Sequence, residues 1–206
     1  MNKTIKQSLG EFGAMLAMRP QGRRVQEALD GRLRELPPGG VLVIDFDGVE
    51  MMDYSFADEA LGTIYSRMAA KEYPDRHLVL EVREDELGEA LLENLEVALN
   101  RREVAALVLS RSAKGSATKT ATFPGRDAKS SPWRVVGTLP GHLVETLKAV
   151  MDKGQITVRE LAGMLGLDSA TACNNRIARL YQLHLVRREA TIVPEGGRQY
   201  SYSAVV

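Results

Sequence analysis

SATACNNRIARLYQ, residues 169–182, decides how the second half of this chain folds. Its residues Cys173, Ile177 and Leu180 recur at helical spacing, which predicts a helix with one apolar face. The preceding segment TVRELAGMLGLD has the same periodicity and a glycine near its end, and Asp168 or Ser169 can cap the second helix. Two short helices joined by such a turn predict a helix-turn-helix, whose second helix can lie in the major groove of DNA.

A hairpin is predicted directly after this helix. HLVRREATIV (184–193) and RQYSYSAVV (198–206) have the composition of strands, and the PEGG between them is a turn. On these features residues 133–206 resemble a winged-helix DNA-binding domain, with NNRIARLYQLHLVRRE and the Gly-Arg-x-Tyr of the second strand as the matching segments. The resemblance implies an α+β fold and duplex DNA as the partner.

Helical spacing also predicts which side chains face outward and could touch DNA. Asn and Gln can pair with adenine and Arg with guanine, so amide and guanidinium groups suit the reading of base edges. The residues expected at base edges are Ser169, Thr171, Asn174, Asn175 and Arg179, with Gln182 on the same exposed side. The residues expected to hold phosphates from the hairpin are Arg187, Arg188 and Arg198. Alternatively, Asn174 and Asn175 cap or bridge helices, and the domain binds a protein.

Length and composition bound the remaining possibilities. A chain of 206 residues can hold two small domains, and 44% hydrophobic with 26% charged residues is ordinary for a globular protein. No apolar run approaches the ~20 residues that span a bilayer, and the first residues lack the apolar core of a signal peptide, so we expect a cytoplasmic protein without a membrane partner. The single cysteine, Cys173, excludes an internal disulfide and belongs to the apolar stripe.

The net charge of zero conceals an asymmetry between the two halves. Residues 1–110 hold 13 Lys and Arg against 20 Asp and Glu, a net charge of −7, whereas residues 111–206 hold 14 against 7, a net charge of +7. A basic segment gains free energy by releasing the counterions condensed on DNA, and an acidic one does not. The two halves are therefore expected to have different partners.

Alternating strands and helices predict an α/β layer structure for the first half. The expected strands are residues 41–46, 77–82 and 104–110, with a short one near residues 4–7. The expected helices begin near Pro20, Ser55 and Asp85.

Three segments of this half resemble a STAS-like domain, the fold of anti-sigma-factor antagonists. They are Phe12, Leu16 and Arg19 in F-x-x-x-L-x-x-R, VIDFDGVEMMDYS (43–55), and SFADEALG (55–62), which is typical of STAS-like proteins of bacteria and their mobile elements. The resemblance implies a mixed sheet with helices and a protein partner, in the known antagonists a histidine-kinase-like ATPase. That partner phosphorylates a serine, which Ser55 matches together with the neighbouring Asp53. Tyr54 and Phe56 depart from the antagonists' pattern.

Ser55 also has a purely structural interpretation. Ser-x-x-Asp, from Ser55 to Asp58, fits a capping box in which each side chain accepts the other residue's backbone N–H at the start of a helix. The positive end of the helix dipole would favour a phosphate at the same position.

Residues 111–132 read as a flexible linker. The segment is rich in Ser, Thr, Ala, Gly and Pro and contains five basic residues and one acidic residue. As a coil it would let the domains move separately.

An enzyme is the main alternative class. Asp45 and Asp47 in VIDFDGV resemble the nucleophile and the acid/base of haloacid-dehalogenase-type phosphatases, which use Mg²⁺. The further acidic pair that holds the metal is missing, since Asp127 is the only acid between Glu103 and Glu145. The three histidines are far apart in the sequence, and one cysteine cannot form a zinc site. The sequence therefore predicts no catalytic residue, metal or cofactor.

Together these features predict a bacterial or phage regulator with a STAS-like domain in residues 1–110, a flexible linker in residues 111–132 and a winged helix in residues 133–206. Winged helices often bind DNA as dimers, so a homodimer is expected. An adaptor in which both domains bind proteins is the alternative from another class.

Overall fold

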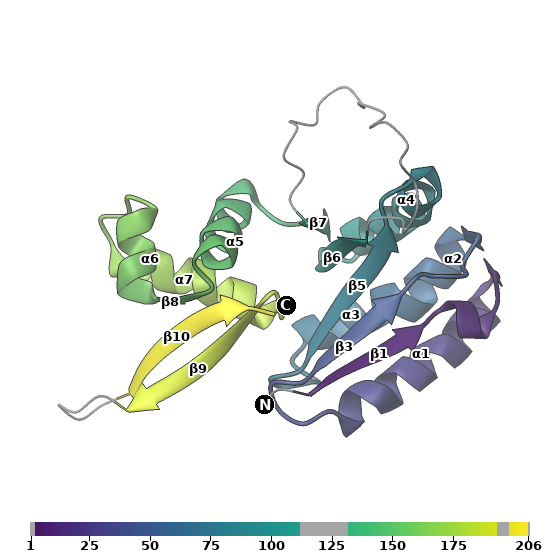
Figure 1. Ribbon diagram of the computed structural model, residues 1–206, viewed down its shortest axis with the longest axis horizontal. Helices are drawn as coiled ribbons and strands as arrows, with labels where there is room; N and C mark the ends of the chain where they lie inside the picture. Colours follow the sequence, from purple (N-terminus) through teal and green to yellow (C-terminus); the bar gives the residue numbers. More distant parts are fainter. Residues whose placement is uncertain (1–2, 112–131, 193–197, 206) are drawn as a thin grey trace.

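A five-stranded sheet with the order β1-β3-β5-β6-β7 forms the core of the first half of the chain (Figure 1). This computed structural model describes residues 3–111, 132–192 and 198–205. The strands are β1 (Thr4–Ser8), β3 (Val41–Asp45), β5 (His77–Arg83), β6 (Ala105–Arg111) and β7 (Trp133–Gly137). The first four run parallel, and β7 runs antiparallel to β6. The mixed α/β fold predicted for the first half is confirmed.

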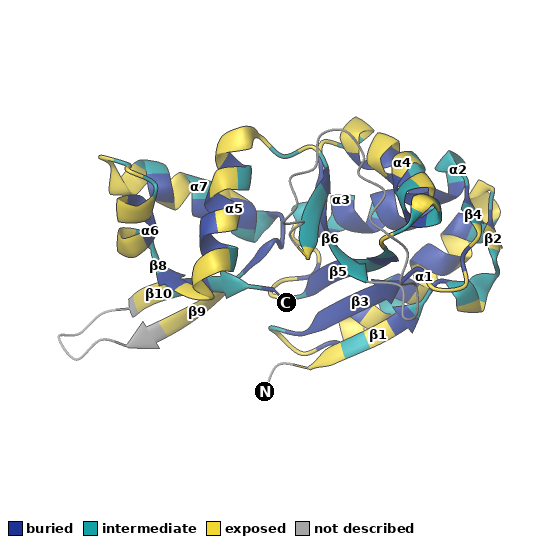
Figure 2. Cartoon of the chain, turned by 45° about the horizontal axis from the view of Figure 1, so that its top comes forward, coloured by how far each residue is buried: buried dark blue, intermediate teal, exposed yellow. Residues whose placement is uncertain are grey.

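Helices cover one face of this sheet. They are α1 (Arg19–Glu35), α2 (Tyr54–Ala57), the π-helical turn η2 (Asp58–Gly62), α3 (Thr63–Ala69) and α4 (Glu86–Arg101). Alternate strand residues such as Leu42, Ile44 and Leu80 belong to the same buried cluster as the apolar stripes of these helices. Figure 2 shows the result, with buried residues on the inner side of α4 and exposed ones on its outer side.

Several short elements precede or interrupt the long ones. The 3₁₀ turn η1 (Gly10–Phe12) follows β1, and β2 (Met15–Leu16) pairs in parallel with β4 (Met51–Met52). Strands of two residues leave no periodic pattern in the sequence and therefore cannot be predicted from it.

The helix predicted from Ser55 onward contains a π-helical turn at η2. The Asp58 carboxylate in this turn is buried and accepts from Arg102 Nε at 2.7 Å, with Arg19 at 3.2 Å. Gly62 ends the turn where a β-carbon would lie 2.8 Å from Arg102 Nε, so a larger residue would disturb this ion pair. The partners satisfy a carboxylate whose burial would otherwise be costly.

The C-terminal elements form a second group. They are α5 (Gly141–Lys153), β8 (Gln155–Thr157), α6 (Val158–Met164), α7 (Ala170–Gln182), β9 (Val186–Ile192) and β10 (Arg198–Ala204). The three strands pair antiparallel in the order β8-β10-β9. Both strands of the predicted hairpin are present, while its PEGG turn lies outside the described residues, as does the predicted linker between Arg111 and Pro132. Among the described helices, none is long and apolar enough to cross a membrane.

The strand β7 differs from the expectation that Trp133 opens the second domain. Trp133 stands opposite Leu109, and Val136 stands opposite Ala106, in an antiparallel ladder with β6. Residues 133–137 therefore complete the sheet of the first half. Strand pairing of this kind joins segments distant in the sequence, which a local pattern does not reveal.

The other face of the sheet shares a buried cluster with the C-terminal elements. Val41, Val43 and Val79 belong to this cluster, together with residues such as Leu147 and Ile177. Successive strand residues point to opposite faces, so one sheet contributes to both cores. The apolar core is continuous between the two halves.

Two buried histidines lie where the halves meet. His184 has a left-handed backbone conformation, with φ 58°. Its Nδ1 lies 2.6 Å from the carbonyl oxygen of Arg76 and its Nε2 lies 2.9 Å from that of Met68, while His77 Nδ1 lies 3.1 Å from the carbonyl oxygen of His184. His77 and His184 are 107 positions apart in the sequence, so no local pattern predicts that they meet.

Acid should destabilise this junction. Burial lowers the pKa of His77 to about 4, from 6.5. Between these pH values the unfolded chain binds a proton that the folded chain does not. The free energy of unfolding should therefore decrease as the pH is lowered, by up to about 3 kcal/mol in total. Denaturant unfolding at several pH values measures this loss.

His77→Gln is the diagnostic variant, because glutamine can still donate an N–H to the His184 carbonyl. We expect this variant to lose part of the dependence on pH below 6.5, while His142→Gln, at an exposed position on α5, should keep all of it. An unchanged pH profile for His77→Gln would contradict the assignment.

Candidate nucleic-acid interface

Local side-chain hydrogen bonds start both helices of the predicted helix-turn-helix. Thr157 and Glu160 form a capping box at α6, in which the Thr157 N–H donates to Glu160 Oε2 at 2.8 Å. The Ser169 hydroxyl accepts the N–H of Ala172 at 3.4 Å and caps α7, so the cap is Ser169 and not Asp168. Gly166, with φ +61°, makes the turn between the helices, where a side chain would be strained.

One face of α7 is fully buried. Cys173, Ile177 and Leu180 are each 0% exposed, as the helical spacing predicted. Burial also raises the pKa of the Cys173 thiol, which lies 3.5 Å from the carbonyl oxygen of Val158 on α6. Cys173 is therefore a core residue that helps to pack α7 against α6, and its predicted role is confirmed.

The opposite face of α7 is exposed and polar. The exposed residues are Ser169, Thr171, Asn174, Asn175 and Arg179. Gln182 is different, because it is half-buried and its Nε2 donates to the carbonyl oxygen of Ala69 at 3.4 Å. The structure thus leaves all five predicted base-edge residues accessible, four of them on α7 and Ser169 at its cap, and turns Gln182 toward the first half.

The arginines of the hairpin lie in different environments. Arg187 and Arg188 are consecutive in β9 and so point to opposite faces. Arg187 is half-buried, burial lowers its pKa, and its Nε has no hydrogen-bond partner among the described residues. Arg188 is exposed, with its guanidinium 4.4 Å from the ring centre of Tyr181 and 4.8 Å from that of Tyr200. Arg198 begins β10, and its side chain lies outside the described part of the structure.

The two tyrosines that stack on Arg188 were missing from the predicted site. Tyr181 comes from the last turn of α7 and Tyr200 from β10, where it stands opposite Ala190. The pairing of β9 with β10 brings Tyr200 to Arg188, and the packing of β9 against the end of α7 brings Tyr181. Stacking of an arginine on aromatic faces is favourable and restricts its motion.

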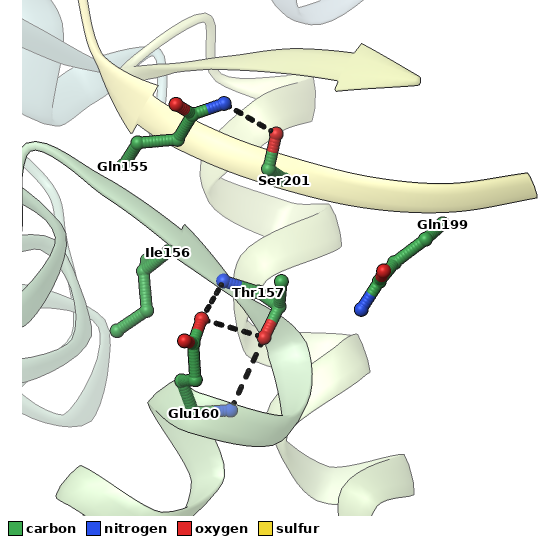
Figure 3. Close-up of a pocket in the computed structure, with 6 residues that line it drawn as sticks. All are labelled: Gln155, Ile156, Thr157, Glu160, Gln199 and Ser201. Carbon is green, nitrogen blue, oxygen red and sulfur yellow. Dashed lines mark hydrogen bonds between the residues drawn. The ribbon is translucent and has the colours of Figure 1, made fainter. Parts of the chain in front are cut away.

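An open pocket of about 270 Å³ lies between β8, the start of α6 and β10 (Figure 3). Gln155 Nε2 donates to the Ser201 hydroxyl at 2.8 Å on one side, and the Glu160 carboxylate accepts from Thr157 on the other. The hydrogen bonds from Thr157 lower the pKa of Glu160, so this group is anionic at neutral pH. A fixed carboxylate makes the pocket a poor site for a phosphate.

The predicted regulatory residues of the first half also have defined roles. Asp53, and not Ser55, caps α2: its Oδ1 accepts the N–H of Phe56 at 2.7 Å and its Oδ2 accepts the N–H of Met18 at 2.9 Å. The predicted capping box of Ser55 and Asp58 is therefore wrong, because the extended backbone that a cap requires occurs at Asp53. Ser55 is half-buried in the first turn.

Asp45, the nucleophile of the phosphatase alternative, belongs to a network of ion pairs. Its Oδ2 lies 3.0 Å from Lys6 and 3.4 Å from Arg111, and its Oδ1 accepts the N–H of Asp47 at 2.9 Å. Both carboxylate oxygens are thus engaged within the protein. Within the described ranges, no group of three or more His, Cys, Asp or Glu residues could hold a metal ion.

Comparison with known proteins identifies part of the first half. Residues 22–82 match the family described as a STAS-like domain of unknown function (DUF4325). Because of this similarity, we call this region the STAS-like domain. No curated protein matches the chain.

A solved structure described as a possible transcriptional regulator from Methanosarcina mazei Go1 is similar over a limited region. The identity is 19% and the TM-score 0.30, over 32% of this chain and 56% of that one. This chain therefore spans little more than half of that protein.

Removing the carboxylate of Asp53 should destabilise the STAS-like domain. Asp53→Ala loses the helix cap and the bond to Met18, so we expect the free energy of unfolding to fall by about 1–2 kcal/mol. Ser55→Ala should change it by less than about 0.5 kcal/mol. Denaturant titration of both variants compares them directly, and a larger loss for Ser55→Ala would return the capping role to Ser55.

Proposed function

We propose that this chain is a DNA-binding regulator, in which residues from α5 to β10 form a winged helix and the STAS-like domain binds a protein partner. The element order helix, strand, helix, helix, strand, strand supports the winged-helix assignment. In this arrangement α7 is the recognition helix and the β9–β10 hairpin is the wing.

The two faces of α7 carry this proposal. Its buried stripe anchors the helix in the core, and the exposed set from Ser169 to Arg179 remains available to base edges. Asn174 and Asn175 present both an amide donor and a carbonyl acceptor, which is the pair that adenine offers in the major groove. Arg179, one turn beyond Asn175, can donate two N–H groups to a guanine.

Charge supports duplex DNA as the partner of this half. Residues 111–206 have a net charge of +7 and residues 1–110 a net charge of −7. The affinity for DNA should therefore fall steeply with salt, as counterion release requires. A homodimer would place two copies of α7 on half-sites about one helical turn apart.

The STAS-like domain and the segment before it support binding of a protein. Met18 and Met15 are 67% and 56% exposed and precede α1, where the Met18 N–H bonds to Asp53. Exposed methionines are adaptable contacts for an apolar partner surface. A histidine-kinase-like ATPase that modifies Ser55 is the partner we propose, since Asp53 is already engaged as the cap.

A protein adaptor that never touches DNA is the second candidate, and the exposed methionines favour it equally. The two candidates differ on a column of immobilised duplex DNA. A regulator should be retained in low salt and elute as the salt concentration rises, whereas an adaptor should pass through.

Replacing Arg179 should relax sequence preference. Arg179→Ala removes a contact to a base edge worth about 1–3 kcal/mol of discrimination, so binding to a preferred duplex should weaken about tenfold or more while binding to random duplexes changes little. Selection from a random duplex pool followed by gel shifts measures both. Arg24→Ala, at an exposed position on α1, is the control and should bind as the unaltered protein does. Equal selectivity of both variants would count against α7 as the recognition helix.

A further inference from the structure

A chain of four side chains leads from the STAS-like domain to the proposed DNA-binding surface. Asp75 lies in the turn between α3 and β5, within the STAS-like residues, and its Oδ1 accepts the hydroxyl hydrogen of Tyr181 at the end of α7. The Tyr181 ring lies against one side of the Arg188 guanidinium and Tyr200 lies close by. Each of these side chains therefore limits the orientation of the next one.

Other contacts hold the end of α7 against the same turn. The His184 ring lies between the carbonyl oxygens of Arg76 and Met68, at 2.6 and 2.9 Å, and Gln182 donates to Ala69. The end of α7 and the following turn thus contact residues 68–76 of the STAS-like domain through Tyr181, Gln182 and His184. The position of Tyr181 thus depends on that domain.

We infer that Tyr181 is a positioning residue for Arg188, and that Asp75 of the STAS-like domain, by holding the Tyr181 hydroxyl, sets the affinity of the wing for DNA phosphates. This inference rests on the proposed function. It adds a route by which the STAS-like domain regulates DNA binding.

The geometry leaves Arg188 free to bind a phosphate. The rings of Tyr181 and Tyr200 contact the Arg188 guanidinium. The hydroxyls of Tyr181 and Tyr202 engage part of its five N–H donors, and the remaining donors can bind a phosphate. Arg188 is exposed, and among the described residues no ion pair joins it to Asp75. A guanidinium already held in place loses less conformational entropy when it binds, so the stacked arrangement is the one with higher affinity.

These contacts give the STAS-like domain a route to regulate DNA binding. A partner that binds the STAS-like domain and displaces the turn after α3 would release Tyr181 and then Arg188. The affinity for DNA would fall without any contact between the partner and the DNA.

The test uses the full chain and a labelled random-sequence duplex of about three helical turns, with dissociation constants measured over a series of salt concentrations. Arg188→Ala should weaken binding by about three- to tenfold and reduce the salt slope by about one. Tyr181→Phe and Asp75→Ala, which break the same hydroxyl bond, should each produce part of this loss, about two- to fivefold. Asp75→Asn retains an oxygen acceptor and should restore binding.

Two further variants separate positioning from general damage. Tyr181→Phe combined with Arg188→Ala should bind no more weakly than Arg188→Ala alone, because both changes act on one contact. Tyr54→Phe is the matched control, since Tyr54 also stacks on an arginine, Arg101, with its hydroxyl 3.2 Å from that guanidinium, but at α2. It should bind DNA as the unaltered protein does.

The outcomes are distinguishable. If the unaltered protein binds duplex DNA and Arg188→Ala weakens it, but Tyr181→Phe and Asp75→Ala have no effect, the inference is wrong and the proposed function stands. The inference is also wrong if the losses of affinity add up in the double variant, or if Arg188→Ala has no effect. If the unaltered protein shows no salt-dependent binding to duplex DNA, both proposals fail together.

Discussion

The alternation of side chains across the five-stranded sheet is the constraint on which the rest of the structure depends. Successive residues of β3 point to opposite faces, so Leu42 and Ile44 pack under the helices while Val41 and Val43 join the cluster of the C-terminal elements. A sheet that is apolar on both faces needs a cover on each. The C-terminal elements share the buried cluster of the second face and so contribute to its cover.

The shared core gives the end of α7 a fixed environment. His77 opens β5, and its ring and the carbonyl groups of the preceding turn surround His184. The left-handed backbone at His184 ends the α7 turn and directs the chain into β9. The helix proposed to read DNA is therefore held at its carboxyl end by the half whose charge is unsuited to DNA. A change in the STAS-like domain can reach α7 through hydrogen bonds, without a flexible linker as the intermediary.

Sequence periodicity predicted the long elements because they bury a regular stripe. The helices α1, α4 and α7 and the strands β3, β5, β6, β9 and β10 lie close to where the sequence pattern placed them. It failed for β2 and β4, which have two residues each, and for β7, which pairs with the edge of β6. The cap at α2 was misplaced by two residues, because Ser55 and Asp53 are equally good caps and the backbone decides between them.

For the candidate interface, the sequence by itself determined which residues of α7 face outward and that they are polar, because helical spacing and the burial of Cys173, Ile177 and Leu180 leave no other orientation. It also determined the opposite charges of the two halves. Only the tertiary structure decided that Gln182 turns inward, that Arg187 and Arg188 lie in different environments, and that Tyr181 joins Arg188 to Asp75. Those outcomes depend on strand register and on contacts between residues more than a hundred positions apart, which no local pattern encodes.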